Sequence, residues 1–103
     1  MEVSKQVEVG TSATDIYKID NNRVGFITNI EIYNSGANDS EITLYDEFTP
    51  YGESTPKQRN IKKVKVAAGA VVQFNRIKKK VMGKLVGIAT NNPVQIDIDI
   101  RMS

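Results

Sequence analysis

The 103-residue sequence contains no cysteine and no histidine. The lack of cysteine excludes disulfide bonds, thiolate nucleophiles, zinc ribbons and iron–sulfur clusters. The lack of histidine removes the imidazole on which catalytic triads, proton transfer near neutral pH and most zinc or copper sites depend. We therefore expect a protein that is not an enzyme, with no catalytic residues, no cofactor and no metal.

Long apolar runs are also lacking, because no stretch approaches the roughly 20 residues that a membrane helix needs, and no membrane partner is expected. The first residues do not show the basic-then-apolar pattern of a signal peptide, which favours synthesis in the cytoplasm. With 40% hydrophobic and 25% charged residues, the composition is that of a globular protein. The length suits a single domain spanning 1–103.

The sequence does contain a repeated alternation of apolar and polar residues, which is typical of half-buried β-strands. In 94–102 the alternation is unbroken, and its apolar face consists of Val94, Ile96, Ile98, Ile100 and Met102. In 24–34 the same pattern predicts an inward face of Val24, Phe26, Ile30 and Ile32. Weaker candidate strands are 2–9, 15–19, 40–48, 61–67, 71–75 and 84–90.

Turn-forming residues separate these segments, at 10–12, 20–22, 35–39, 68–69 and 91–93. Many short strands at a spacing of about ten residues are typical of sandwiches and jelly rolls, not of alternating strand–helix units. We therefore predict an all-β protein, a two-sheet antiparallel β-sandwich of jelly-roll-like form with about eight strands.

One segment interrupts the alternation. Residues 49–60 contain two prolines and almost no aliphatic residues, so we expect a long exposed loop there. Long loops in small domains are commonly either mobile or functional. If this loop contacts a partner, Tyr51 is its expected anchor, because aromatic residues are enriched at the centres of protein interfaces.

The formal net charge of +2 conceals a strong separation of charge along the chain. Residues 1–53 hold ten of the twelve acids and three bases, whereas 54–96 hold ten bases and no acid. Three explanations stay open. In the first, neighbouring strands pair acids with bases across a sheet. In the second, the basic residues of 54–96 dock on another copy or on an acidic protein. In the third, they bind phosphate backbones.

Residues 76–82 concentrate this basic charge and are typical either of a polyanion patch or of a charged sheet edge that blocks aggregation. With Tyr51, the residues that we predict to bind a partner are Lys57, Arg59, Lys62, Lys63, Lys65, Lys78, Lys79, Lys80 and Lys84. Phe74 is the one aromatic residue of 54–96, which disfavours the base-stacking platforms of single-strand binders.

Two groups of carboxylates remain as candidates for chemistry. Asp97 and Asp99 share a strand face, and Asp46, Glu47 and Glu53 flank the long loop. Neither group has the dense Asp/Asn/Gly spacing of a specific calcium site. We expect both to be solvated carboxylates on strand surfaces.

Five segments resemble small β-sandwich virion proteins of tailed bacteriophages, of the head decoration or fibre-associated type. They are 11–17 (Thr-Ser-Ala-Thr-Asp-Ile-Tyr), 29–36 (Asn-Ile-Glu-Ile-Tyr-Asn-Ser-Gly), 41–45, 66–72 and 86–94. The resemblance implies a jelly-roll-like module in a virion. It also implies binding to a symmetric protein surface, with a major capsid or other virion protein as partner and a trimer as the favoured homo-oligomer.

The leading functional hypothesis is thus a non-catalytic viral structural protein, either a capsid decoration protein or a related virion accessory. The alternative is a polyanion- or nucleic-acid-binding module that uses the basic residues between 57 and 84. A third hypothesis, a receptor- or carbohydrate-binding tip domain, draws on the use of jelly rolls by lectins.

Overall fold

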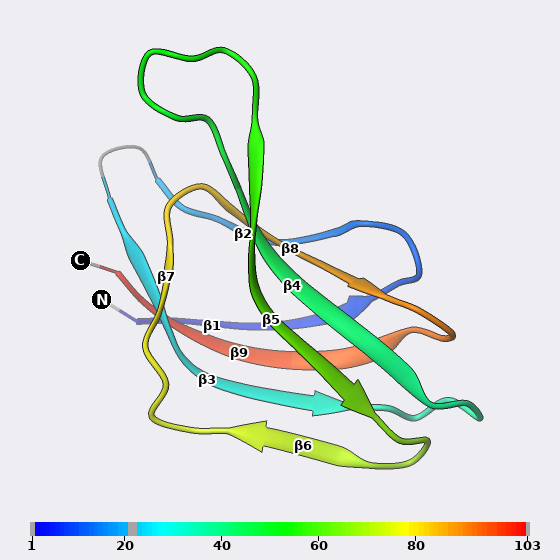
Figure 1. Cartoon of the computed structure of the whole chain (residues 1–103). Helices are drawn as coiled ribbons and strands as arrows, with labels where there is room; N and C mark the ends of the chain where they lie inside the picture. The colour runs from blue at the N-terminus through cyan, green and yellow to red at the C-terminus, as the bar shows by residue number, and fades with distance from the viewer. Residues whose placement is uncertain (1, 21–22, 103) are drawn as a thin grey trace.

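A computed structural model describes residues 2–20 and 23–102 (Figure 1). Within these residues the chain forms nine strands and no helix. The strands are β1 (Glu2–Val9), β2 (Thr14–Lys18), β3 (Gly25–Tyr33), β4 (Ser40–Phe48), β5 (Lys57–Val66), β6 (Val71–Phe74), β7 (Lys79–Val81), β8 (Lys84–Ala89) and β9 (Val94–Met102). Asn21 and Asn22 of the predicted turn lie outside the described residues.

The strands form two antiparallel sheets that pack face to face. Sheet A has the order β1-β9-β3, and β6 and β7 pair one after the other with the remaining edge of β3. Sheet B has the order β2-β8-β4-β5. The pairs are nested, because β1 pairs with β9, β2 with β8, β3 with β6 and β7, and β4 with β5. This wrapping of one long hairpin is a jelly roll, in which β6 and β7 together fill one of eight strand positions. The predicted fold class is confirmed.

The core lies between the sheets and follows the alternation of the longest strands. Apolar residues at every second position of β4, β8 and β9 point inward, as strand geometry requires. The largest fully buried side chains are Ile27, Ile30, Ile32, Ile42, Leu44, Leu85, Ile96, Ile98 and Ile100.

The predicted inward face of β3 is wrong in its first half. The strand contains a bulge between Ile27 and Asn29 where it pairs with β9, and a bulge shifts the alternation by one residue. Ile27 is therefore fully buried, and Phe26 points outward and is half-buried. Ile30 and Ile32, which follow the bulge, point inward as predicted.

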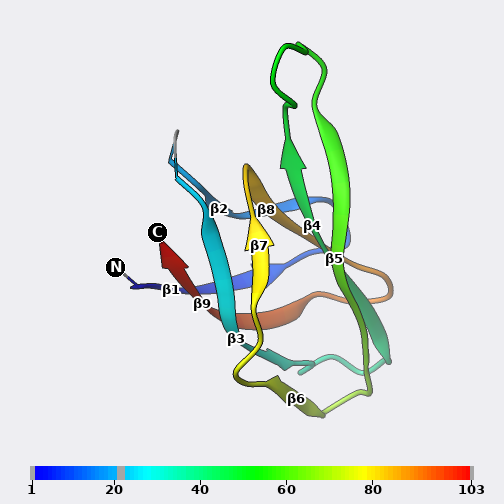
Figure 2. The ribbon, with the colours of Figure 1, turned by 60° about the vertical axis from the view of Figure 1, so that its left-hand side comes forward.

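The predicted loop at 49–60 is too long. Lys57, the first residue of β5, pairs with Phe48, and the pairing continues through Asn60 opposite Tyr45. The connection therefore spans only 49–56, and it caps a β4–β5 hairpin that projects beyond the rest of the sandwich in both views (Figure 1; Figure 2). Pairing with β4 holds residues 57–60 of β5 in place, although these four residues include no aliphatic side chain.

Candidate functional site

The acidic and basic parts of the sequence meet within sheet B, where the acidic strand β4 lies between β5 and β8. Each ion pair described by the structure joins an acid from 15–53 to a base from 57–84, with N–O distances of 3.3–3.7 Å. The pairs are Lys57 with Glu53, Arg59 with Asp46, Lys63 with Glu41, and Lys84 with Asp15 and Glu47. Pairing within the protein is thus confirmed for four of the predicted partner-binding bases.

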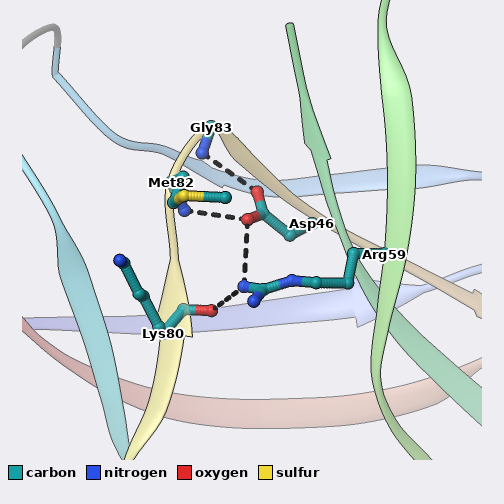
Figure 3. A network of polar contacts seen from close by, with 5 residues as sticks. All are labelled: Asp46, Arg59, Lys80, Met82 and Gly83. Atoms are coloured by element: carbon teal, nitrogen blue, oxygen red, sulfur yellow. Dashed lines mark hydrogen bonds and ion pairs between the residues drawn. The ribbon is translucent and has the colours of Figure 1, made fainter. Parts of the chain in front are cut away.

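Asp46 is the exception among these acids because its side chain is fully buried. Its Oδ2 accepts hydrogen bonds from the backbone N–H of Met82 (2.8 Å) and from Arg59 Nη2 (3.4 Å), and its Oδ1 accepts one from the N–H of Gly83 (2.9 Å) (Figure 3). Arg59 Nη2 also donates to the carbonyl oxygen of Lys80 at 2.7 Å. The network joins β4 and β5 of sheet B to the β7–β8 turn.

The expectation that Asp46 is a solvated surface carboxylate is therefore wrong. Asp46 is in phase with Ile42 and Leu44, so it continues the inward face of β4 past the end of the apolar core. The charge is tolerated there because three donors converge on it. The spacing of two and four residues that separates Asp46 from Leu44 and Ile42 was the feature of the sequence that could have predicted an inward side chain.

Close packing at the β7–β8 turn makes Gly83 a sensitive position. A Cβ on this residue would clash with the backbone oxygen of Glu47 and lie 2.9 Å from Phe48 Cα. We predict that Gly83→Ala lowers the free energy of unfolding by about 1–3 kcal/mol, because the turn must move away from β4. Urea unfolding measures this loss, with Gly10→Ala as the control, since its Cβ would have no neighbour within 3.4 Å. Equal stability of both variants would contradict the packing described.

Lys84 contacts two carboxylates from different strands, at 3.3 Å from Asp15 Oδ1 and 3.7 Å from Glu47 Oε1. Asp15, by hydrogen bonding and charge, and Glu47 more weakly, hold the pKa of the Lys84 ammonium above its ordinary value, although burial opposes them. A raised folded-state pKa gives stability that is fully present below the unfolded value of about 10.4 and is lost as the pH rises through the folded value.

We therefore predict that the stabilisation from Lys84 is lost in alkaline solution. Wild type should be more stable than Lys84→Met at about pH 8, and this difference should vanish near pH 12. Urea midpoints of both proteins across this range provide the measurement, and the comparison cancels titrations that the two share. A difference independent of pH would argue against the ion pairs.

The other predicted bases have no carboxylate partner among the described residues. Lys62 and Lys78 lie over aromatic rings, at 4.1 Å from the centre of Phe74 and 5.2 Å from that of Phe26. Lys65, Lys79 and Lys80 are exposed. The ten predicted residues are thus not one site, since they divide between internal ion pairs, ring contacts and free surface.

The cluster of basic residues in 76–82 lies at a sheet edge. Lys79 and Lys80 belong to β7, which among the described strands pairs with β3 alone, and so the edge interpretation of this cluster fits the topology. The sequence did not predict β7, because Val81 is its one apolar residue. Arg76 precedes it and adopts a left-handed φ of 57°, where the chain passes from β6 to β7.

Tyr51 lies in the loop that caps the β4–β5 hairpin and is fully exposed. Beside the hairpin is a groove of about 1010 Å³ that reaches Tyr17 on β2 and Lys84 on β8. Lys5 Nζ lies 5.5 Å from the centre of the Tyr17 ring. The exposed position suits a partner contact of Tyr51, which stays a prediction.

The outer face of sheet A carries carboxylates that the sequence placed on strand surfaces. Asp97 is exposed, and Asp99 accepts hydrogen bonds from Ser4 Oγ (2.7 Å) and Asn29 Nδ2 (3.2 Å). Glu31 of β3 stands directly opposite Asp97 of β9. Across 2–20 and 23–102, no group of three or more acidic side chains is arranged to hold a metal ion.

Comparisons with known proteins define the class of the fold and no family. No protein-family model matches the sequence, and no curated protein matches it. A solved structure described as "Bacillus endospore appendages form a novel family of disulfide-linked pili" is similar, with a TM-score of 0.57 and 12% identity over 99% of this chain and 82% of that chain. At this identity the likeness shows a shared fold, that of a small β-sandwich, and the bacteriophage part of the resemblance stays a prediction.

No helix in the described part of the chain is long and apolar enough to cross a membrane.

Proposed function

We propose that this protein is a non-catalytic structural subunit that assembles with further copies of itself into an ordered surface structure. The observation that carries the proposal is the likeness, over nearly the whole chain, to a pilus protein of the same fold. The dimensions of 44 × 28 × 16 Å and the rigid two-sheet core suit a building block. The absence of histidine and cysteine supports the non-catalytic part of the proposal.

We expect assembly of this protein to proceed without disulfide bonds between copies. The similar pili are described as disulfide-linked, whereas this sequence has no cysteine with which to form such a bond. Contacts between copies therefore depend on charge, buried apolar area and the open strand edges of the sheets. We expect assemblies that form equally well with and without a reducing agent.

A virion decoration protein is the more specific form of this proposal. In that role the jelly roll would bridge neighbouring subunits of a major capsid or other virion protein, as a trimer, with basic side chains against an acidic surface. Co-sedimentation with capsid shells tests this form, and a protein that assembles alone but never binds shells would count against it. A filament subunit would assemble with its own copies but would not bind capsid shells.

Two other hypotheses receive less support. Polyanion binding would use the bases between 57 and 84, of which Lys57, Arg59, Lys63 and Lys84 already contact carboxylates. A carbohydrate-binding tip would need a platform of aromatic rings. Tyr17 and Tyr51 line the same groove, but Tyr45 is buried in the sandwich and Tyr33 lies beside Glu31 and Asp97 on sheet A, so the four tyrosines form no single platform.

Light scattering combined with size exclusion tests the proposal on the wild-type protein. We expect species larger than a monomer at protein concentrations of about 10–500 μM, within the range of weak to moderate affinities. Negative-stain images of the same samples should show repeating units. A monomer under all these conditions, with and without reductant, would refute the proposal.

A further inference from the structure

The outer face of sheet A contains three neighbouring acidic side chains that form no ion pair with any described residue. We call Glu31, Asp97 and Asp99 the acidic strip. Glu31 and Asp97 are direct cross-strand neighbours, and Asp99 follows on the same face of β9. Like charges placed opposite each other destabilise a sheet. None of the three forms an ion pair with a described residue, so the strip costs stability in the isolated protein.

The matching positive charge lies at the edge of the same sheet. We call 76–80 the basic segment, in which Arg76, Lys78, Lys79 and Lys80 are all exposed. The described residues offer none of these four bases a carboxylate within ion-pair distance. Lys78 contacts the Phe26 ring instead.

The geometry of the sheet keeps the two charged groups apart within one molecule. On the side of β6, the partner of Glu31 is Gln73, whose Nε2 donates to Glu31 Oε2 at 3.4 Å. Near the basic segment, the backbone N–H of Arg76 donates to Asn29 Oδ1 at 3.4 Å. Neutral amide side chains therefore separate the acidic strip from the basic segment.

Apolar groups lie beside both charged groups. A shallow hollow of about 570 Å³ near the basic segment is lined by Phe26, Thr28, Ile77, Lys78, Arg101 and Met102. At the other end of the face, Tyr33 and Val71 stand opposite each other with 42% and 56% of their surface exposed. Apolar groups next to complementary charges are typical of protein interfaces.

We propose that the acidic strip of one copy binds the basic segment of a second copy. This inference rests on the proposed function and names the surfaces through which copies associate. The second copy supplies the charges that the sheet holds unneutralised, and the apolar groups beside them become buried. Because two different surfaces meet, the contact can be repeated from copy to copy along an assembly.

A charge-swap experiment tests the pairing directly. Glu31→Lys/Asp97→Lys gives the acidic strip a net positive charge, and Lys79→Glu/Lys80→Glu removes the net positive charge of the basic segment. Each variant alone should associate at least tenfold more weakly than wild type in light scattering. An equimolar mixture of the two variants should recover association, which also shows that both are folded. Salt should weaken wild-type association, because it screens charges at the protein surface.

Matched controls change the same number of charges elsewhere. Asp20→Lys/Glu53→Lys and Lys5→Glu/Lys18→Glu alter exposed residues outside both surfaces, and they should associate as wild type does. If each charge-swap variant alone associated as strongly as wild type, the inference would be overturned and the proposed function would be left intact. Loss in both variants without recovery on mixing would also overturn it. A wild type that is always monomeric would instead refute the proposed function itself.

Binding of nucleic acid is the competing use of the basic segment. If wild type remained on immobilised DNA at about 150 mM salt and Lys79→Glu/Lys80→Glu did not, the segment would be a polyanion site. That outcome, together with unchanged association of Glu31→Lys/Asp97→Lys, would overturn the pairing of copies. We expect elution of wild type from DNA below that salt concentration.

Discussion

Replacing Asp46 by alanine will lower the free energy of unfolding by about 3–5 kcal/mol, as is typical when one partner of a buried charged network is removed. The substitution leaves the N–H groups of Met82 and Gly83 without their acceptor. It also leaves Arg59 without its carboxylate. In a domain of this size we expect the melting temperature to fall by more than about 12 °C.

Urea unfolding followed by circular dichroism provides the measurement, with Asp97→Ala as the matched control. Asp97 is also a strand aspartate, but it is exposed and stands opposite another acid. Its removal should change stability by no more than about 0.5 kcal/mol. If Asp46→Ala behaved like this control, the buried network would not hold the β7–β8 turn against β4.

The second large effect is expected at Asn34, a fully buried polar residue at the opposite end of the sandwich. Its Nδ2 donates to the carbonyl oxygens of Asn38 (2.8 Å) and Val66 (2.9 Å). Its Oδ1 accepts from the N–H of Gly36 (3.0 Å) and from Asn92 Nδ2 (2.8 Å). One side chain thereby joins the β3–β4 connection, the end of β5 and the β8–β9 turn.

We predict that Asn34→Ala destabilises the protein by about 2–4 kcal/mol, because it leaves several buried or half-buried groups without partners. Thermal and urea unfolding should agree on this loss. Asn75→Ala is the control, since the Asn75 side chain is exposed and makes no described hydrogen bond. A loss below about 1 kcal/mol for Asn34→Ala would show that the loops hold together without it.

Three strands in which apolar residues largely keep a period of two were predictable from the sequence. The predicted bounds 2–9, 40–48 and 94–102 agree with β1, β4 and β9, because in these segments the pleat and the apolar pattern have the same period. The bulge in β3 was not predictable, since no residue type marks it and its effect is a shift in phase. The first half of β5 and the whole of β7 were missed because partner strands, and not their own apolar residues, hold them in place.

The candidate site was also only partly predictable from the sequence. The separation of acids from bases is visible in the sequence, but which of them meet depends on the register of β4 with β5 and β8. That register places Glu47 opposite Lys84 and Asp46 opposite Arg59. In the other sheet, the register of β3 with β9 places Glu31 opposite Asp97, which no count of charges along the chain could reveal.

If this jelly roll is a structural subunit, its copies assemble through their complementary charged surfaces. Electron cryomicroscopy of wild-type assemblies at low salt tests this arrangement, because the density places neighbouring copies against each other. We expect repeating jelly-roll units in which Glu31 and Asp97 of one copy face Lys79 and Lys80 of the next. Only isolated monomers under these conditions, or ordered assemblies in which both surfaces face solvent, would contradict it.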